Sequence, residues 1–306
     1  MNGLELSRAF FEEYGEPMLQ HEFAPVLPFL AAGLFGSGSE CFGYDDAVSQ
    51  DHDFEPGFCI FLPGEDQVDR RTAFLLERAY AKLPREFRGF QRPYELPVGG
   101  ARRGVLRTAE FFGKIAGTED GSLSTEQWLT MPEQALAEAT NGCLFFDNPG
   151  EVTRIREALS YFPEDIRLKR LAGHLLLMAQ SGQYNYQRCL RHGETAAARL
   201  AVCEFVNSAL AAVFLLNRRY RPYYKWTFRA LRGLPVLSTL SEPLECLLAG
   251  RDASLIDTVC ASVLSCCCEQ DLLKTDFSGD LERCAYAVND RIRDSEIRNL
   301  HILAAT

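Results

Sequence analysis

The sequence lacks the cysteine spacing of a zinc site or of a disulfide framework. Its eleven cysteines are an odd number, no two of them form a C-x-x-C pair, and several lie within apolar helical patterns. Cys266, Cys267 and Cys268 are consecutive, and consecutive helical residues point about 100° apart, so they cannot converge on one tetrahedral metal. We therefore predict reduced thiols that serve as small packing residues.

Long hydrophobic runs are also missing. The longest apolar runs, such as SALAAVFLLN at 208–217, are far below the roughly 18 residues of a membrane-spanning helix. The N-terminal segment has no basic stretch followed by an apolar core, and the chain shows no internal repeat and no low-complexity tract. These absences predict a cytoplasmic protein with no membrane partner.

Positive charge is absent from one long segment and concentrated in another. Residues 9–69 contain no Lys or Arg against thirteen acidic residues, whereas NRRYRPYYKWTFRALR at 217–232 carries six basic residues and no acid. The whole chain has a net charge of −10, which disfavours binding to DNA, because such binding depends mostly on Lys and Arg at phosphates.

The hydrophobic patterns predict an α+β protein with two domains. In residues 1–120, helical spacing near the N-terminus is followed by an apolar strand running into a tight turn at 28–39 and by interrupted strand residues at 51–63. A helical pattern at 66–87 and a short strand leading into a helix at 103–117 come next. From 121 to 306 the apolar residues recur at three- and four-residue steps. The expected fold is a mixed sheet with helices in 1–120, followed by a mainly helical domain in 121–306.

The window AGLFGSGSECFGYDDAVSQDHDF at 32–54 holds a D-x-D pair and a Gly-Ser turn. Side chains alternate along a strand, so Asp51 and Asp53 share one face, where Mg²⁺ or Mn²⁺ would relieve their repulsion. Gly36 lets a backbone approach closely, and the hydroxyl of Ser37 together with exposed amides can bind a phosphate oxygen, with Ser39 close by. The window indicates metal-assisted phosphoryl or nucleotidyl chemistry.

The apolar strand, the Gly-Ser turn, the thirteen-residue spacer (38–50) and the D-x-D pair resemble the signature of the DNA polymerase beta-like nucleotidyltransferase superfamily. GSGSE, GYDD, SxDHDF, YNYQRCLRHG and LNRRYRPYYKW, between about residues 30 and 235, are similar to a bacterial family of nucleotidyltransferase-like proteins. The aminoglycoside and lincosamide nucleotidyltransferases look like more distant relatives.

The resemblance implies an N-terminal catalytic domain of the nucleotidyltransferase type and a helical substrate-binding domain. It implies that Gly36 and Ser37 hold the phosphates of ATP or another NTP, and that Asp51 and Asp53 bind Mg²⁺. An NMP, expected to be AMP, would pass to a hydroxyl of a small molecule such as an antibiotic-like compound, and pyrophosphate would leave.

The sequence departs from this superfamily where a third carboxylate is expected on a later strand. The segment RGVLRT at 103–108 offers Leu106 there, and Glu95 and Glu110 are the nearest acids. This departure favours an alternative in which a catalytically degenerate protein binds a nucleotide or a partner.

The helical half contains a set of cationic and aromatic residues that suits a nucleotide. Guanidinium and ammonium groups neutralise phosphate, and aromatic faces stack on bases or pack against sugars. We expect Arg188 and Lys225 to bind the nucleotide, and Tyr184, Tyr186 and Tyr223 to contact the acceptor; a solvated helix surface is the alternative.

Three further residues suggest two other roles. Glu194 is a candidate general base, because helical domains of the antibiotic-modifying relatives contribute such a carboxylate; a solvated position is the alternative. Arg167 and His174 have a spacing found in HEPN-like helical ribonucleases and toxin–antitoxin modules. His174 lies in the apolar pattern LAGHLLLM, which favours packing in the core.

Overall fold

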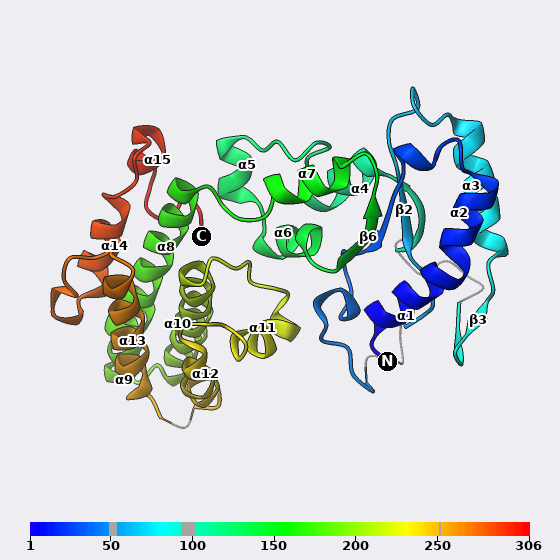
Figure 1. Cartoon of the computed structure of the whole chain (residues 1–306). Coiled ribbons are helices and arrows are strands. Elements are labelled where there is room, and N and C mark those ends of the chain that lie inside the picture. The colour runs from blue at the N-terminus through cyan, green and yellow to red at the C-terminus, as the bar shows by residue number, and fades with distance from the viewer. Residues whose placement is uncertain (49–53, 93–101, 251) are drawn as a thin grey trace. The chain divides into compact units, whose positions relative to one another are not determined.

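The computed structural model describes residues 1–48, 54–92, 102–250 and 252–306 (Figure 1). Asp51 and Asp53 of the D-x-D pair lie outside the described residues, and so does Glu95. The described part confirms an α+β protein with a helical C-terminal region.

The chain divides into two compact units. The first comprises residues 1–123 and 135–160, and the second comprises 124–134 and 161–306. The sequence-based division placed everything after residue 120 in the helical domain, whereas β6 (Cys143–Asp147) and α7 (Glu151–Ala158) pack in the first unit. The reason is strand pairing, because β6 forms a ladder with β1 near the start of the chain.

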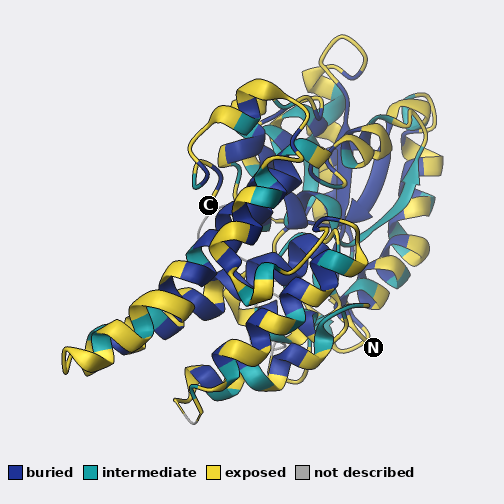
Figure 2. Cartoon of the chain, turned by 90° about the vertical axis from the view of Figure 1, so that its left-hand side faces the viewer, coloured by how far each residue is buried: buried dark blue, intermediate teal, exposed yellow. Residues whose placement is uncertain are grey.

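A four-stranded mixed sheet, with the order β5-β2-β1-β6, forms the first unit's centre. β1 (Ala31–Leu34) runs antiparallel to both β2 (Cys59–Leu62) and β6, and β2 runs parallel to β5 (Gly104–Arg107). The ladder between β1 and β6 has an irregularity between Ala32 and Gly33. β1 and β2 are completely buried, and the dark strands of Figure 2 show this.

Helices and one small hairpin complete the first unit. They are α1 (Gly3–Phe10), a π-helical turn (Phe11–Gly15), α2 (Glu16–Glu22), two 3-10 turns (Leu27–Phe29 and Glu40–Phe42), α3 (Arg70–Lys82), the hairpin of β3 (Glu86–Phe87) and β4 (Phe90–Gln91), α4 (Thr108–Ala116), and α6 (Glu133–Thr140), which begins in the second unit. Phe10 and Phe11 pack on Phe58 beside β2, and Tyr80 of α3 donates a hydrogen bond of 2.9 Å from its hydroxyl to the Phe58 carbonyl.

The described part of the second unit is built from helices. They are α5 (Thr125–Thr130), α8 (Glu164–Met178), a π-helical stretch (Ala179–Asn185), α9 (Tyr186–Arg191), α10 (Thr195–Leu216), α11 (Tyr224–Leu231), a 3-10 turn (Ser238–Leu240), α12 (Ser241–Leu248), α13 (Leu255–Glu269), a 3-10 turn (Phe277–Gly279), α14 (Leu281–Asn289) and α15 (Ser295–Asn299). α8 lies against both α10 and α14 (Figure 1).

Helix α10 is the centre of this bundle. It has 22 residues, and its most apolar window has a mean hydropathy of 1.7, so it is long and apolar enough to cross a membrane; it is the one such helix in the described ranges. However, 67% of its most apolar window is buried inside the protein, as in the core helix of a soluble protein. The uninterrupted apolar run in this helix is short, and the helix reaches membrane length because it extends from Thr195 through less apolar turns.

Local signals explain where several helices begin. Asp69 caps α3 by accepting a hydrogen bond of 2.7 Å from the Thr72 amide. Ser124 and Gln127 form a capping box at the start of α5. The five residues CLFFD, by contrast, form β6 within a region predicted to be helical. The secondary structure of such a short apolar run depends on the strand with which it pairs.

All eleven cysteines are free thiols, and six of them are buried. Burial raises the pKa of the Cys59 thiol to about 12 and that of Cys41 well above its usual range. Cys266 and Cys267 are buried on α13, and Cys268 is half-buried. These positions agree with thiols that pack in the interior.

Candidate functional site

The Gly-Ser turn follows β1 directly. Gly36 has a φ of +116°, a conformation that glycine adopts readily. Its amide donates a hydrogen bond of 2.8 Å to Asn141 Oδ1, and Asn141 Nδ2 donates one of 2.8 Å to the Gly36 carbonyl. Ser37 Oγ donates to Glu138 Oε2 at 2.8 Å. Both groups proposed to bind phosphate are therefore hydrogen-bonded within the first unit.

A cavity of about 320 Å³ opens beside this turn, and we call it the first-unit cavity. Phe35, Leu106 and Phe111 give it an apolar wall. Its charged lining residues come from the 3-10 turn after β1, from β5 and its preceding segment, and from α4: Glu40, Arg102, Arg103, Arg107, Glu110 and Lys114. Four cations and two carboxylates thus surround an apolar wall.

Several of these charges are held by the protein itself. Arg103 Nη2 lies 3.2 Å from Glu40 Oε1, with both side chains buried, and Arg103 Nη1 lies 3.5 Å from Glu55 Oε1. Arg107 Nη1 donates a hydrogen bond of 2.6 Å to the Pro63 carbonyl. Arg103 is therefore neutralised by two acids, while Arg107 and Lys114 contribute charge to the cavity with no ion pair to a described residue.

The position of the expected third carboxylate lies in this cavity. Leu106 is on β5, paired in register with Phe61 of β2, and it lines the first-unit cavity with Gly36 and Ser37. Glu110, on the following helix α4, lines the same cavity. Within the described ranges no cluster of three or more His, Cys, Asp or Glu side chains is arranged to hold a metal ion, so the predicted metal site depends on the two aspartates.

The other predicted site residues lie outside the first-unit cavity. Ser39 precedes the 3-10 turn Glu40–Phe42, and its carbonyl accepts hydrogen bonds from the Phe42 and Tyr44 amides. In the second unit, Arg188 Nη1 donates a hydrogen bond of 3.0 Å to the Tyr184 hydroxyl, and both side chains are exposed on one face of a helical stretch.

Three further predicted residues also lie apart from one another. Tyr186 lines a separate cavity of about 240 Å³ with Leu190 and Arg199. Glu194 is exposed at the start of α10 and makes no capping hydrogen bond with its side chain. Lys225 is exposed, with Nζ 5.0 Å from the centre of the Trp226 ring. The expected cationic and aromatic set does not line one cavity.

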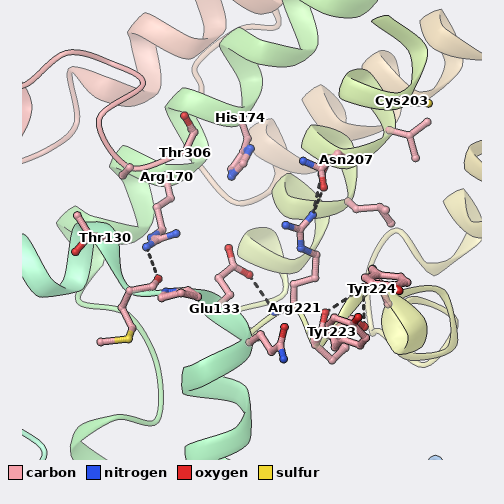
Figure 3. A pocket seen from close by; sticks show the side chains of 18 of the residues that line it. Thr130, Glu133, Arg170, His174, Cys203, Asn207, Arg221, Tyr223, Tyr224 and Thr306 are labelled. Carbon is pink, nitrogen blue, oxygen red and sulfur yellow. Dashed lines mark hydrogen bonds between the residues drawn. The ribbon is translucent and has the colours of Figure 1, made fainter. Parts of the chain in front are cut away.

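Tyr223, in contrast, lines a second and larger cavity of about 850 Å³, which we call the second-unit cavity. The cavity lies among the segment after α5, helices α8 and α10, the start of α11 and the C-terminal residues 304–306 (Figure 3). Its polar side chains converge from these elements: Glu133, Arg170, His174, Asn207 and Arg221.

A hydrogen-bond network fixes the outer part of this polar group. Arg170 Nη2 donates to the carbonyls of Trp128 and Leu129 in α5 and of Met131 just after it, the shortest bond being 2.8 Å to Met131. The Arg221 amide donates to Glu133 Oε2 at 3.0 Å, and Arg221 Nη1 donates to Asn207 Oδ1 at 2.8 Å. These bonds hold the loop, α8 and α10 together around the cavity.

Burial changes the acid–base properties of the same group. His174 is 7% exposed, and burial, with the charges of Arg221 and Arg170, lowers its pKa to about 3. Burial also raises the pKa of the Glu133 carboxyl, against the lowering effect of the two arginines. At neutral pH His174 is therefore an uncharged ring beside two guanidinium groups.

A comparison with protein families found a match that covers part of the lining of this cavity. Residues 128–227 match the model of the Domain of unknown function (DUF4037). Glu133, Arg170, His174, Asn207 and Arg221 fall within the match, whereas the lining residues Phe228, Leu248 and 304–306 lie outside it. Neither a curated protein nor a solved structure matches the chain.

Sequence reasoning singled out Arg167 with His174 and missed Arg170. Arg167 is buried, but its guanidinium forms an ion pair of 2.6 Å with Glu164. Arg170 precedes His174 by four residues, a spacing that places both on one helical face, and this is the signal that could have found the pair. Glu133 and Arg221 come from distant segments and had no such signal.

Proposed function

We propose that the chain is a Mg²⁺-dependent nucleotidyltransferase whose first-unit cavity receives the nucleotide. The proposal rests on one observation: the Gly36–Ser37 turn, several cationic side chains and an aromatic wall line the same cavity of the first unit. Cations neutralise phosphate oxygens and aromatic faces accept a base, so the lining suits a nucleoside triphosphate.

In this proposal Arg107 and Lys114 bind the phosphates, because their charges are not neutralised by an ion pair with a described residue. The Ser37 hydroxyl donates its proton to Glu138, and its remaining lone pairs cannot donate to a phosphate oxygen. A phosphate at the turn therefore binds either after this hydroxyl turns away from Glu138 or through the nearby backbone amides. Arg188, Lys225, Tyr184 and Tyr186 remain proposed contacts in the second unit.

The proposed metal ligands are Asp51 and Asp53, since the described residues supply no metal cluster of their own. Mg²⁺ takes oxygen ligands and shares its shell with substrate phosphates, so two carboxylates beside a phosphate site suit it. The bound metal would neutralise charge on the phosphates. Glu110 is the described carboxylate best placed to assist an acceptor hydroxyl in the first-unit cavity, while Glu194 remains a proposed base.

The proposed reaction transfers an NMP, preferentially AMP from ATP, to a hydroxyl of a small acceptor and releases pyrophosphate. Reduced, buried thiols favour a cytoplasmic location for it. Negative net charge argues against DNA as the acceptor.

Leu106 favours a second candidate, a protein that binds nucleotide without catalysis. It occupies the strand position of the expected third carboxylate and lines the cavity beside the turn. A metal site that lacks one charged ligand binds its metal more weakly and assists deprotonation of the acceptor less. Binding of phosphate by the cationic side chains does not depend on that ligand.

One experiment separates the two candidates. The full chain is incubated with each NTP, Mg²⁺ or Mn²⁺ and a panel of small hydroxyl-bearing acceptors, and pyrophosphate and the mass of the acceptor are measured. We expect metal-dependent release that Asp51→Asn abolishes. Lys114→Met should weaken NTP binding by about tenfold, while Lys82→Met, an exposed lysine of α3, leaves it unchanged.

The remaining outcomes are equally informative. Binding of NTP that needs no metal and yields no pyrophosphate would support the non-catalytic candidate. Absence of NTP binding by the intact chain would eliminate both.

A further inference from the structure

The second-unit cavity contains buried polar atoms whose hydrogen-bonding capacity is unused. Arg170 and His174 are 6% and 7% exposed, and Arg170 Nε and His174 Nδ1 have no partner within the described residues. Leaving a buried donor or acceptor unpaired costs about 1–3 kcal/mol, and native proteins rarely do so without a ligand or an ordered water. The two atoms belong to neighbouring side chains on α8, so one ligand group can reach both.

The arrangement of the side chains directs these groups inward. Figure 3 shows Arg170 and His174 reaching from α8 toward Glu133, which extends from the opposite segment. Arg170 lines the cavity and is anchored through Nη2 to the end of α5 and to Met131, while its Nε has no partner among the described residues. The site is therefore preformed by contacts within the second unit.

The charge of the cluster selects the ligand's head group. Arg170 and Arg221 contribute two positive charges, an ionised Glu133 contributes one negative charge, and His174 is neutral near pH 7. One negative charge balances this sum. A phosphate dianion would leave one excess negative charge next to Glu133. A carboxylate carries the single negative charge required, and its planar shape matches that of a guanidinium.

The rest of the cavity selects an apolar body. Met131, Pro222 and Phe228 line it, and Tyr223 and Tyr224 stand at its edge with ring centres 4.2 Å apart and 41% and 77% of their surfaces exposed. The volume of about 850 Å³ lies in the range of small-molecule sites. Apolar walls with a few convergent polar groups are characteristic of such sites.

We propose that the second-unit cavity binds a small organic monocarboxylate with an apolar or aromatic body. Its carboxylate accepts hydrogen bonds from Arg170 and His174, and its body packs against the apolar wall and Tyr223. The neutral histidine ring carries one N–H, and the ligand selects the tautomer that donates to it. This proposal is independent of nucleotide chemistry in the first unit.

The test uses the full chain with benzoate and phenylacetate as probes. Benzamide and phenylacetamide are neutral controls of the same shape, and inorganic phosphate tests the alternative anion. Binding is followed by saturation-transfer NMR and by titration calorimetry. We expect both carboxylates to bind at least about tenfold more tightly than their amides and than phosphate.

Variants locate the binding in this cavity. Arg170→Gln should weaken phenylacetate by at least about tenfold, but it also removes three hydrogen bonds to the backbone. His174→Gln is the second variant, because this side chain makes no hydrogen bond that the fold would lose, and it should weaken phenylacetate several-fold. Arg291→Gln, an exposed arginine of the same unit, is the matched control and should bind as the wild type does.

Three outcomes would overturn the proposal. They are equal affinity for carboxylates and amides, a preference for phosphate, or a folded His174→Gln protein that binds phenylacetate as Arg291→Gln does. Failure of both carboxylates to bind would overturn it as well, and would mean that water satisfies the unpaired atoms.

Discussion

His174 illustrates how a single buried side chain makes the stability of the protein depend on pH. Its pKa is about 3 in the folded chain, because burial and the charges of Arg221 and Arg170 disfavour the protonated ring. In the unfolded chain the ring titrates near its ordinary value of 6.5. The unfolded state therefore binds one more proton than the folded state between these two pH values, and protonation favours unfolding.

We predict that the free energy of unfolding falls as the pH drops below about 6.5, with His174 contributing roughly 1.4 kcal/mol per pH unit in the middle of the window. Above pH 6.5 the contribution of His174 is constant, since the ring is neutral in both states. His174→Gln, which stays uncharged, should remove this contribution. Urea unfolding at several pH values between about 4.5 and 7.5 measures both slopes.

The matched control is His192→Gln, which replaces an exposed histidine of the same unit. It should retain the slope of the wild type. Equal slopes for the wild type and His174→Gln would mean that the buried ring does not control the acid sensitivity.

Residue types and short spacings predicted some single positions and not others. Helix caps such as Ser124 and Asp69 can be recognised from the sequence, because a cap depends on residues within one turn. The engagement of Ser37 by Glu138 and of Gly36 by Asn141 was not readable, because those partners lie more than a hundred positions along the chain. The turn was predicted from sequence, and its hydrogen-bond partners required the fold.

At the scale of elements, the pairing of β1 with β6 depends on Gly33. A Cβ atom on Gly33 would lie 2.5 Å from the Cys143 carbonyl oxygen and 3.0 Å from the Leu144 Cα. Both neighbours are backbone atoms of β6, which cannot move aside as the end of a flexible side chain can. The irregular register at Ala32 and Gly33 lies at this close approach.

We predict that Gly33→Ala lowers the free energy of unfolding by about 1–3 kcal/mol, because the two strands must separate to admit the methyl group. Gly113→Ala is the control in the same unit. Its new Cβ would meet only Glu119 Cγ at 3.8 Å, and alanine is favoured over glycine within helix α4 by about 0.5–1 kcal/mol. Thermal or urea unfolding measures both; a Gly33→Ala protein as stable as the wild type would contradict the close contact.

The elements with strong local patterns were predicted from the sequence, and the element defined by its partner was not. α3, α8 and α10 show apolar spacing over several turns, and β1 and β2 are short apolar runs flanked by Pro or Gly. The segment CLFFD has the same flanking signals, Gly142 before it and Pro149-Gly150 after it, but it stands between helical patterns and becomes a strand because β1 offers it an unpaired edge. Strand pairing between distant segments is not encoded in a local period.

At the scale of the whole molecule, both cavities have an excess of positive charge in an acidic chain. The chain has a net charge of −10, yet three arginines and a lysine line the first-unit cavity and two arginines line the second-unit cavity. Surface charges further away than about 8–10 Å are largely screened at physiological salt, so the local cations dominate for a small anion inside. Both proposed ligands, a nucleotide and a carboxylate, are anions of this kind.

The division of the chain also determines which fragments can fold. The first unit contains residues 135–160 in addition to 1–123, so a fragment that ends at 120 lacks β6 and α7. Without β6, the backbone of β1 loses a ladder partner on one side, and the Gly36 amide loses Asn141. A buried strand edge left unpaired is costly and prone to association.

We therefore predict that residues 1–160 unfold cooperatively in urea, whereas residues 1–120 show no cooperative transition and associate. Circular dichroism during unfolding and light scattering of the two fragments at equal concentration measure the difference. Residues 1–134 are a matched control, because they add chain length without β6 and should behave as 1–120 does. A cooperative, monomeric 1–120 fragment would show instead that β1 needs no partner on that edge, and the first unit would then end where the hydrophobic pattern first changes.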